Sequence, residues 1–166
     1  MRFKTVGNKV DIAAVVVRNA EATVAIPIGS PVVYHIAATN PGLDVVLPGT
    51  EVTMATAGIM GVALGNIANA QYGEAQVFGF CNNVLLGSTR AASTDSWSTR
   101  SAAAGVILNV DTVNNVFITS GGTQAVSGFV PFAVLGASYT VTGSASATSD
   151  TRTSATFLGK GFLRMM

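Results

Sequence analysis

The sequence predicts a mainly β fold, either a small β-barrel or a β-sandwich, with short helical turns and extended termini. Residues that favour helices are few, with three Lys, three Glu and three Gln in 166 residues. Val and Thr, which favour strands, are abundant. Turn signals built from Gly and Pro recur at short intervals between short apolar segments. Many short strands at this spacing favour a sandwich or a barrel over alternating strands and helices.

Strand-like segments fill the first half of the chain. IGSP at Ile28–Pro31, NPGLD at Asn40–Asp44 and LPGT at Leu47–Thr50 separate them, because Pro fixes φ and Gly admits a positive φ. The segment Gly65–Tyr72 fits either a loop or one or two helical turns. The predicted strands of this half are Val10–Val17, Thr23–Ile28, Pro31–Ile36, Asp44–Leu47, Ile59–Leu64, Glu74–Phe80 and Val84–Leu86.

The second half begins after a Ser/Thr/Ala-rich segment, Gly87–Ala104, which we expect to be an exposed excursion whose Ala-rich end suits a short helix. Thr142–Thr156 is a similar stretch and predicts an exposed loop, and SGG at Ser120–Gly122 suits a hairpin tip. The predicted strands here are Gly105–Val110, Asn115–Ile118, Gln124–Leu135, Ser138–Val141 and Ala155–Leu163. We expect a single domain over residues 1–166, or two small β lobes at about 1–87 and 105–166 joined by segment 88–104.

Composition and charge exclude several classes of protein. Only 10% of the residues are charged and 49% are hydrophobic, which is the opposite of the balance in a disordered chain. A net charge of +1 does not supply the dense cationic surface that nucleic-acid binding needs, so no nucleic-acid partner is expected. One Cys and one His leave no disulfide framework and no Cys-rich or His-rich metal motif.

No membrane partner is expected either. The longest uninterrupted apolar run, Ile12–Val17, is far shorter than the about 20 residues of a spanning helix. The opening MRFKTVGNKVD lacks the long apolar run of a secretory signal. Three Tyr and one Trp are too few for the aromatic girdles of an outer-membrane barrel. The high hydrophobic content is expected if neighbouring copies in an assembly cover much of the protein's own surface.

Candidates for catalytic chemistry are few and lack partners. His35 alternates with apolar residues in VVYHIAA, which favours a strand histidine over a general base. Cys81 follows an apolar strand without a basic partner in sequence, which favours a buried residue. The eight acids are dispersed, and Gly58–Gly65 lacks the spacing of a phosphate-binding loop. We expect no enzyme, no catalytic residue, no cofactor and no metal site.

Basic and aromatic residues are interleaved near both ends of the chain. Arg2, Lys4 and Lys9 precede the first acid, and three more basic residues follow the last acid, Asp150. This pattern favours docking onto an acidic partner surface. A single tryptophan in a loop, Trp97, suits an interface anchor. The predicted partner contacts are Arg2, Phe3, Lys4, Lys9, Trp97, Phe162 and Arg164.

One stretch of the chain resembles a known family. Ala57–Leu86 reads AGIMGVALGNIANAQYGEAQVFGFCNNVLL, with a strand containing GVA, a short linker, and Gly73–Glu74 opening an alternating strand. This arrangement resembles an element of bacteriophage head decoration, or capsid cement, proteins. AIPIGSPVVY at Ala25–Tyr34 and GKGFLRMM at Gly159–Met166 are similar to other parts of that family. The resemblance covers about the middle third of the chain and its C-terminus, through short apolar motifs.

The resemblance implies a structural virion protein with a small barrel or sandwich. Such a protein binds the outer surface of the shell formed by the major capsid protein, as a homotrimer or less often a dimer, without a cofactor. Its expected location is the capsid exterior, after synthesis in the cytoplasm of the host bacterium. We expect the basic segment Met1–Val10 to contact the shell. Two alternatives stay open, a phage tail-tip or fibre module and a carbohydrate-binding β-sandwich that uses Trp97.

Overall fold

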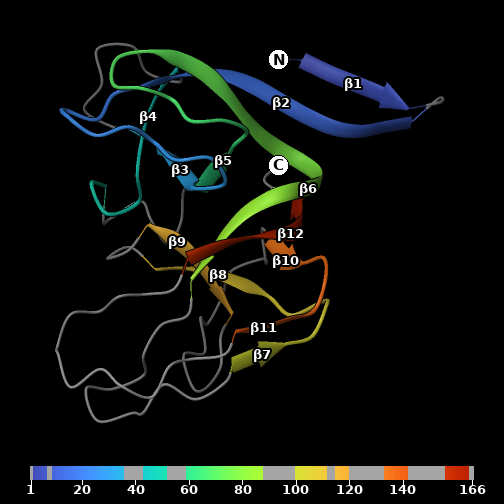
Figure 1. Ribbon diagram of the computed structural model, residues 1–166. Helices are drawn as coiled ribbons and strands as arrows, with labels where there is room; N and C mark the ends of the chain where they lie inside the picture. Colours follow the sequence, from blue (N-terminus) through green and yellow to red (C-terminus); the bar gives the residue numbers. More distant parts are fainter. Residues whose placement is uncertain are drawn as a thin grey trace, which may run out of the picture.

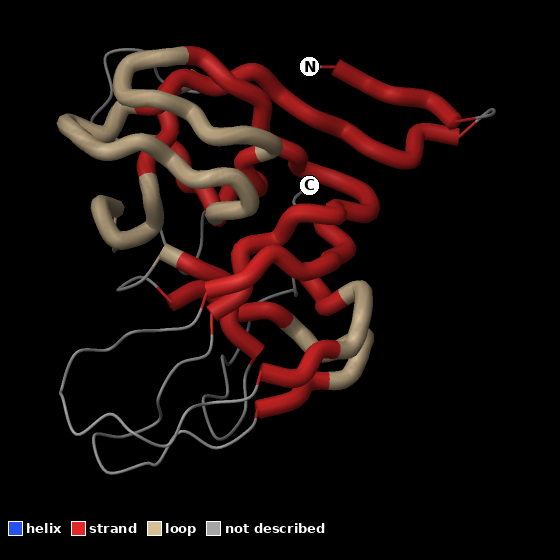
Figure 2. The backbone as a smooth tube through the Cα atoms, in the orientation of Figure 1, coloured by secondary structure: helices blue, strands red, loops and turns tan. Residues whose placement is uncertain are grey.

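The computed structural model describes residues 2–6, 9–35, 43–51, 59–87, 100–111, 115–119, 133–141 and 156–164. Within these residues the chain forms strands, turns and loops, and no helix is present (Figure 2). The predicted mainly β fold is therefore confirmed. The short helical turns of that prediction are absent from the residues described.

Strands account for most of the described chain (Figure 1). They are β1 (Arg2–Val6), β2 (Lys9–Asn19), β3 (Pro31–Tyr34), β4 (Asp44–Val46), β5 (Ile59–Ala63), β6 (Tyr72–Gly87), β7 (Arg100–Ala102), β8 (Leu108–Asp111), β9 (Val116–Thr119), β10 (Ala133–Leu135), β11 (Tyr139–Val141) and β12 (Thr156–Arg164).

Five of these strands close into a small barrel. β2 runs parallel to β4, with Arg18 opposite Asp44. Antiparallel pairings then join β4 to β3, β3 to β5 and β5 to β6. β6 pairs with β2 from Ile12 to Arg18 and closes the ring. Closure leaves these strands without the open edges that an isolated sheet would expose.

β6 is 16 residues long and continues beyond the barrel into a second group of strands. β12 pairs antiparallel with this part of β6, and β10 pairs with β12. β9 joins β6 in parallel at Phe117 and Leu86, and β8 pairs with β9. A bridge between Ile107 and Val134 connects the start of β8 to β10. β7 and β11 form a separate two-stranded sheet.

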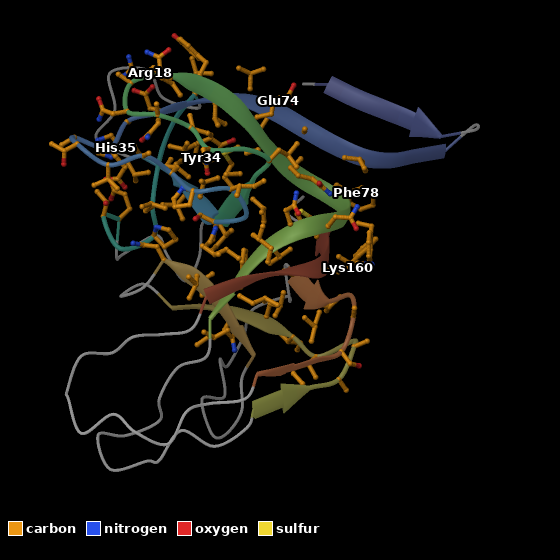
Figure 3. All side chains as sticks on the ribbon, in the orientation of Figure 1. Arg18, Tyr34, His35, Glu74, Phe78 and Lys160 are labelled. Carbon is orange, nitrogen blue, oxygen red and sulfur yellow. The ribbon has the colours of Figure 1, made fainter. Side chains whose placement is uncertain are left out.

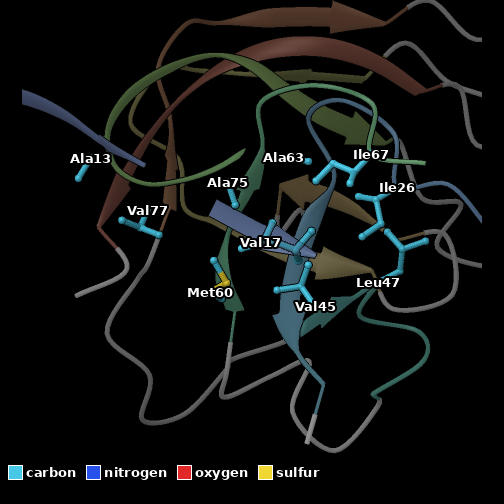
Figure 4. Packing of buried hydrophobic residues seen from close by; sticks show 11 residues of the cluster. Ala13, Val17, Ile26, Val45, Leu47, Met60, Ala63, Ile67, Ala75 and Val77 are labelled. Carbon is cyan, nitrogen blue, oxygen red and sulfur yellow. The ribbon is translucent and has the colours of Figure 1, made fainter. Parts of the chain in front are cut away.

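Two apolar clusters lie inside these groups of strands. The first occupies the barrel and includes Val17, Ile26, Val45, Met60 and Ile67 (Figure 4). The second includes Val84, Leu86, Leu108, Phe117 and Leu163. Burial of each such aliphatic or aromatic side chain contributes about 1.5–3 kcal/mol to folding. β6 supplies residues to both clusters. The alternative of two lobes joined by segment 88–104 stays a prediction.

The predicted strand Thr23–Ile28 is wrong. This segment is a loop in which Ile26 alone makes a β-bridge, with Ile67. The carbonyl of Val24 accepts a hydrogen bond from the side chain of Asn19, and Pro27 has no N–H to donate. The backbone groups of the segment are therefore not arranged to form a continuous ladder.

The predicted break between Glu74–Phe80 and Val84–Leu86 is also wrong, because β6 runs through it. Gly161 lies opposite Cys81 and Gly159 lies opposite Val84. Two residues of β6 therefore face one residue of β12, which is a β-bulge. Asn82 and Asn83 therefore form a bulge within a paired strand and not a turn.

Other differences concern short segments. Arg100–Ala102 forms β7, so the start of the Ala-rich end expected to suit a short helix is a strand. Gly65–Tyr72 follows the loop alternative up to the start of β6. β1 was not among the predicted strands. The expected excursion at 88–99, the hairpin tip at 120–122, most of Gln124–Leu135 and the loop at 142–155 lie outside the described residues.

Candidate partner-binding surface

His35 follows β3 and contacts an acid from a neighbouring turn. Its Nδ1 lies 2.6 Å from Oε1 of Glu51, and both side chains are partly exposed. The backbone N–H of His35 donates to the carbonyl of Asp44 at 3.0 Å. These contacts hold the end of β3 against the adjacent strand and turn, which gives the histidine a structural role.

Cys81 is almost fully buried in the second cluster. Burial raises the pKa of its thiol above the ordinary value, and a backbone hydrogen bond at Asn83 lowers it by a smaller amount. A nucleophilic cysteine needs a lowered pKa and solvent access. The environment of Cys81 is that of a packed apolar residue.

The described residues contain neither a candidate metal site nor a candidate membrane-spanning helix. No three His, Cys, Asp or Glu side chains of that part of the chain gather where they could hold an ion. None of its segments is a helix of the length and hydropathy that crossing a membrane requires.

The predicted partner contacts near the N-terminus lie on a β-hairpin. β1 carries Arg2, Phe3 and Lys4, and Lys9 begins β2. β1 pairs with the first residues of β2 and stands at one end of the strand order. The hairpin extends away from the barrel (Figure 1). The expectation that Met1–Val10 is extended therefore agrees with residues 2–6 and 9–10.

Both ends of the chain contribute a strand to one sheet. Phe3 on β1 pairs with Ala13 on β2, Ala13 pairs with Phe78 on β6, and Phe78 pairs with Arg164 on β12. Phe162 lies two residues before Arg164 on the same strand. The structure thus places Arg2, Phe3, Lys4, Phe162 and Arg164 on one sheet, in which β2 and β6 lie between β1 and β12. Trp97 lies outside the described residues.

Four apolar side chains, of which three are exposed, form a row across the part of this sheet that contains β6 and β12. Phe80 pairs with Phe162, Phe162 with Val134, and Val134 with Ile107, so the four residues cross β6, β12, β10 and the residue before β8. Phe80, Phe162 and Ile107 are 42%, 41% and 45% exposed. We call these four residues the aromatic row. Exposed apolar residues in contiguous positions mark interaction sites more often than scattered ones do.

Packing fixes the rings of the aromatic row. The rings of Phe162 and Phe78 meet edge to face, with centroids 5.7 Å apart and planes at 73°. Phe80 lies over Gly136, where a Cβ would stand 2.8 Å from the ring atom Cε2. Rigid aromatic side chains lose little entropy on binding a partner, so they are favoured as interface anchors.

One cation lies beside the aromatic row. Lys160 and Phe162 alternate with Gly161 along β12, so their side chains point to the same face. Both are exposed, whereas Gly161 is buried. Lys160 and Phe78 lie on the same side of the molecule (Figure 3). Lys160 therefore places one positive charge beside the row.

Sequence reasoning identified Phe162 but missed Phe80, Val134 and Ile107. Each lies in a different segment of the chain, and the pairing of β6, β12 and β10 brings them together. The alternation of Leu158, Lys160 and Phe162 with glycine and leucine was the available signal for one strand of this surface.

Comparison with protein-family models, with curated proteins and with solved structures finds no match to this chain.

Proposed function

We propose that this chain is a structural virion protein that decorates and stabilises a bacteriophage capsid. It would bind the outer surface of the major capsid protein shell as a homotrimer, at the capsid exterior, after synthesis in the host cytoplasm. The resemblance of Ala57–Leu86 to head decoration proteins supports this proposal. It needs neither a catalytic centre nor a cofactor, because its function lies in contacts between proteins.

The observation that carries the proposal is the hairpin β1–β2 beside the aromatic row. Basic residues of β1 and β12 are on the same sheet as three Phe residues of β6 and β12. Aromatic anchors supply affinity, and the exposed Lys160 next to Phe162 along β12 favours an acidic partner. A capsid shell presents the same binding site many times. A modest contact at each site therefore adds up to a large stabilisation of the whole particle.

Binding to undecorated shells tests this proposal. The shells are assembled from the major capsid protein encoded in the same genome, and bound protein is measured by co-sedimentation. One variant lacks residues 1–8, which removes β1 and leaves β2 intact. A second carries Phe80→Ser and Phe162→Ser. We expect each to weaken binding about tenfold or more, as loss of interface anchors does.

The matched control is Val24→Ser, which replaces an exposed apolar residue in the loop between β2 and β3. This variant should bind shells as the native chain does. Shell binding that is undetectable for the native chain, or unchanged in both test variants, would contradict the proposal.

The alternatives give different results in two further measurements. A shell protein is present in hundreds of copies per particle, whereas a tail-tip or fibre module is present in few. A carbohydrate-binding protein should change its tryptophan fluorescence when sugars are added, and Trp97 is the single tryptophan that would report this. Low copy number favours the tail assignment, and a saturable fluorescence change favours the sugar-binding one.

A further inference from the structure

β6 bends sharply where it leaves the barrel (Figure 1). Gln76 is still a barrel residue, because it pairs with Ala14 of β2 and with Val62 of β5. Phe78 pairs with β2 and with β12, and it lies at the turn of the strand (Figure 3). Phe80 pairs with β12. The bend therefore lies between the barrel and the part of β6 that belongs to the aromatic row.

The backbone at the bend departs from a regular strand in two ways. Gly79 has a φ of +96°, which lies in the region that side chains of L-residues rarely adopt. The pairing of β6 with β2 skips Val77, which is therefore the extra residue of a β-bulge. Bulges bend a strand and change the direction of the side chains that follow. This backbone therefore decides where the next aromatic residues of β6 point.

The side chain of Gln76 spans the bend. Its Nε2 donates to the carbonyl oxygen of Phe78 at 3.2 Å and to that of Phe80 at 3.1 Å. These are the residues directly before and after Gly79. Both partners are acceptors, so only the NH₂ group of the amide, with its two donor hydrogens, can bond to them. One side chain of the barrel thus holds the backbone on both sides of the bend.

The two residues that Gln76 holds support the aromatic row. Phe80 is a member of the row, and the ring of Phe78 packs edge to face against the ring of Phe162. Anchors that are already ordered before binding lose less entropy when a partner docks. Gln76 itself is 2% exposed, so a docked partner does not reach it. Its effect on binding must therefore pass through the aromatic residues.

We propose that Gln76 is a positioning residue for the shell-binding surface. By joining the carbonyls of Phe78 and Phe80 across the bend, it keeps Phe80 and Phe162 in the arrangement that binds the shell. This inference rests on the proposed function and assigns the aromatic row no second partner. If Gln76 acts through these rings, its removal weakens binding only while the rings are present.

A double-mutant cycle tests this dependence. Gln76→Met keeps a side chain of similar length and removes both donors. Affinity for undecorated shells is measured by co-sedimentation for the native chain, for Gln76→Met, for the variant with Phe80→Ser and Phe162→Ser, and for the triple variant. We expect Gln76→Met to weaken binding about fivefold in the native background, because the anchors must be ordered on docking. It should have no further effect once both Phe residues are replaced. An equal effect in the two backgrounds would overturn the inference.

The matched control is Asn19→Ala. Asn19 is also a buried amide that donates to two backbone carbonyls, those of Val24 and Ile67, but it lies where β2 pairs with β4. At a temperature at which both variants are folded, Asn19→Ala should bind shells as the native chain does. Equal losses of binding in Asn19→Ala and Gln76→Met would show that lower stability alone weakens binding, and would also overturn the inference.

A second variant changes the bend without removing the amide. Gly79→Ala strains the backbone at a positive φ, so it should also weaken shell binding, and it provides the test if Gln76→Met does not fold. Amide hydrogen exchange supplies a measurement without shells. Exchange at Gly79 and Phe80 should be faster in Gln76→Met than in the native chain, whereas exchange in β3 should be unchanged.

The outcomes separate this inference from the proposed function. A native chain that does not bind shells would reject both. A native chain that binds shells, together with a folded Gln76→Met or Gly79→Ala variant of unchanged affinity, would reject the role of Gln76 and leave shell binding supported.

Discussion

Arg18 and Asp44 lie opposite each other where β2 and β4 run parallel, and they form a two-point ion pair. Nε of Arg18 donates to Oδ1 of Asp44 at 2.8 Å, and Nη2 donates to Oδ2 at 3.0 Å. Asp44 is 1% exposed, whereas the side chain of Arg18 is 31% exposed. The pair joins two strands that are far apart in sequence, and it therefore helps to close the barrel.

Replacing Arg18 and replacing Asp44 should both lower the free energy of unfolding, but by different amounts. Arg18→Met leaves a buried carboxylate without its cation and should cost about 3–5 kcal/mol. Asp44→Asn leaves a guanidinium that water still reaches, so about 2 kcal/mol is expected. Urea denaturation followed by circular dichroism measures both. Equal losses, or losses below about 0.5 kcal/mol for both variants, would show that the pair does not couple the strands.

Three glycines separate the effects of steric contact and backbone conformation. Gly29 has φ +82°, and a Cβ there would lie 2.7 Å from the backbone nitrogen of Leu85 and 2.9 Å from the carbonyl oxygen of Asn83. Gly105 has φ +87° with open space around it, and Gly65 has open space with no positive φ. Each position can be changed to Ala.

We expect Gly29→Ala to destabilise the protein by about 3 kcal/mol or more, because it combines strain with a clash against backbone. Gly105→Ala should cost about 1 kcal/mol from conformation alone. Gly65→Ala should be neutral or slightly stabilising. Thermal unfolding should rank the three in this order. A Gly29→Ala variant as stable as Gly65→Ala would contradict the close approach of this turn to the bulge in β6.

The sequence predicted most strands because alternation and turn residues are local signals. Gly29 and Pro31 mark a real turn, and the segments around Val32, Val62 and Ala75 are real strands. The errors arose where distant partners decide the structure. Asn82 and Asn83 resemble a turn, but pairing with β12 keeps them inside β6.

The candidate surface was predictable in part for the same reason. Phe162 lies among charges at the end of the chain, so the sequence marks it. Phe80 looks like an ordinary strand residue until β12 is placed beside it. Only the register of β6, β12 and β10 joins Phe80, Phe162 and Val134 into one row, in which the two Phe side chains are exposed.

Asn19 links three segments of the barrel through its buried side chain. Its Nδ2 donates to the carbonyls of Val24 and Ile67, both at 2.9 Å, and its Oδ1 accepts from the N–H of Glu21 at 2.9 Å. Asn19→Ala removes the hydrogen bonds to the Val24 carbonyl and the Glu21 N–H, whereas the carbonyl of Ile67 still accepts from the N–H of Ile26. The loss should cost about 2–4 kcal/mol. Urea denaturation measures the loss. Asn66→Ala, which removes one exposed contact to the N–H of Ile28, should cost about 1 kcal/mol or less.

If Asn19→Ala is no less stable than Asn66→Ala, the carbonyl of Val24 and the N–H of Glu21 must find other partners. Faster amide exchange at Glu21, relative to residues of the second cluster, would show that the loop opens locally. That result locates the effect of Asn19 in the loop between β2 and β3.

Cys81 should be unreactive in the folded protein and should make stability depend on pH only in the alkaline range. Burial raises its thiol pKa above the ordinary value, so the folded state favours the protonated thiol. The stabilisation that this preference contributes is present at neutral pH. It declines as the pH rises past about 8.5, where the thiol of the unfolded chain begins to ionise.

Two measurements check this behaviour. A thiol reagent such as a maleimide should label the native protein at pH 7.5 far more slowly than the urea-unfolded chain, because Cys81 is almost fully buried among apolar side chains. The free energy of unfolding of the native chain should fall more between pH 8 and pH 10 than that of Cys81→Ala, which cannot ionise at this position. Cys81→Ala itself should lose about 1 kcal/mol at pH 7 through the smaller side chain. Rapid labelling of the folded chain, together with parallel pH profiles of the two proteins, would show that the thiol reaches water and that the packing of the second cluster is looser than its burial indicates.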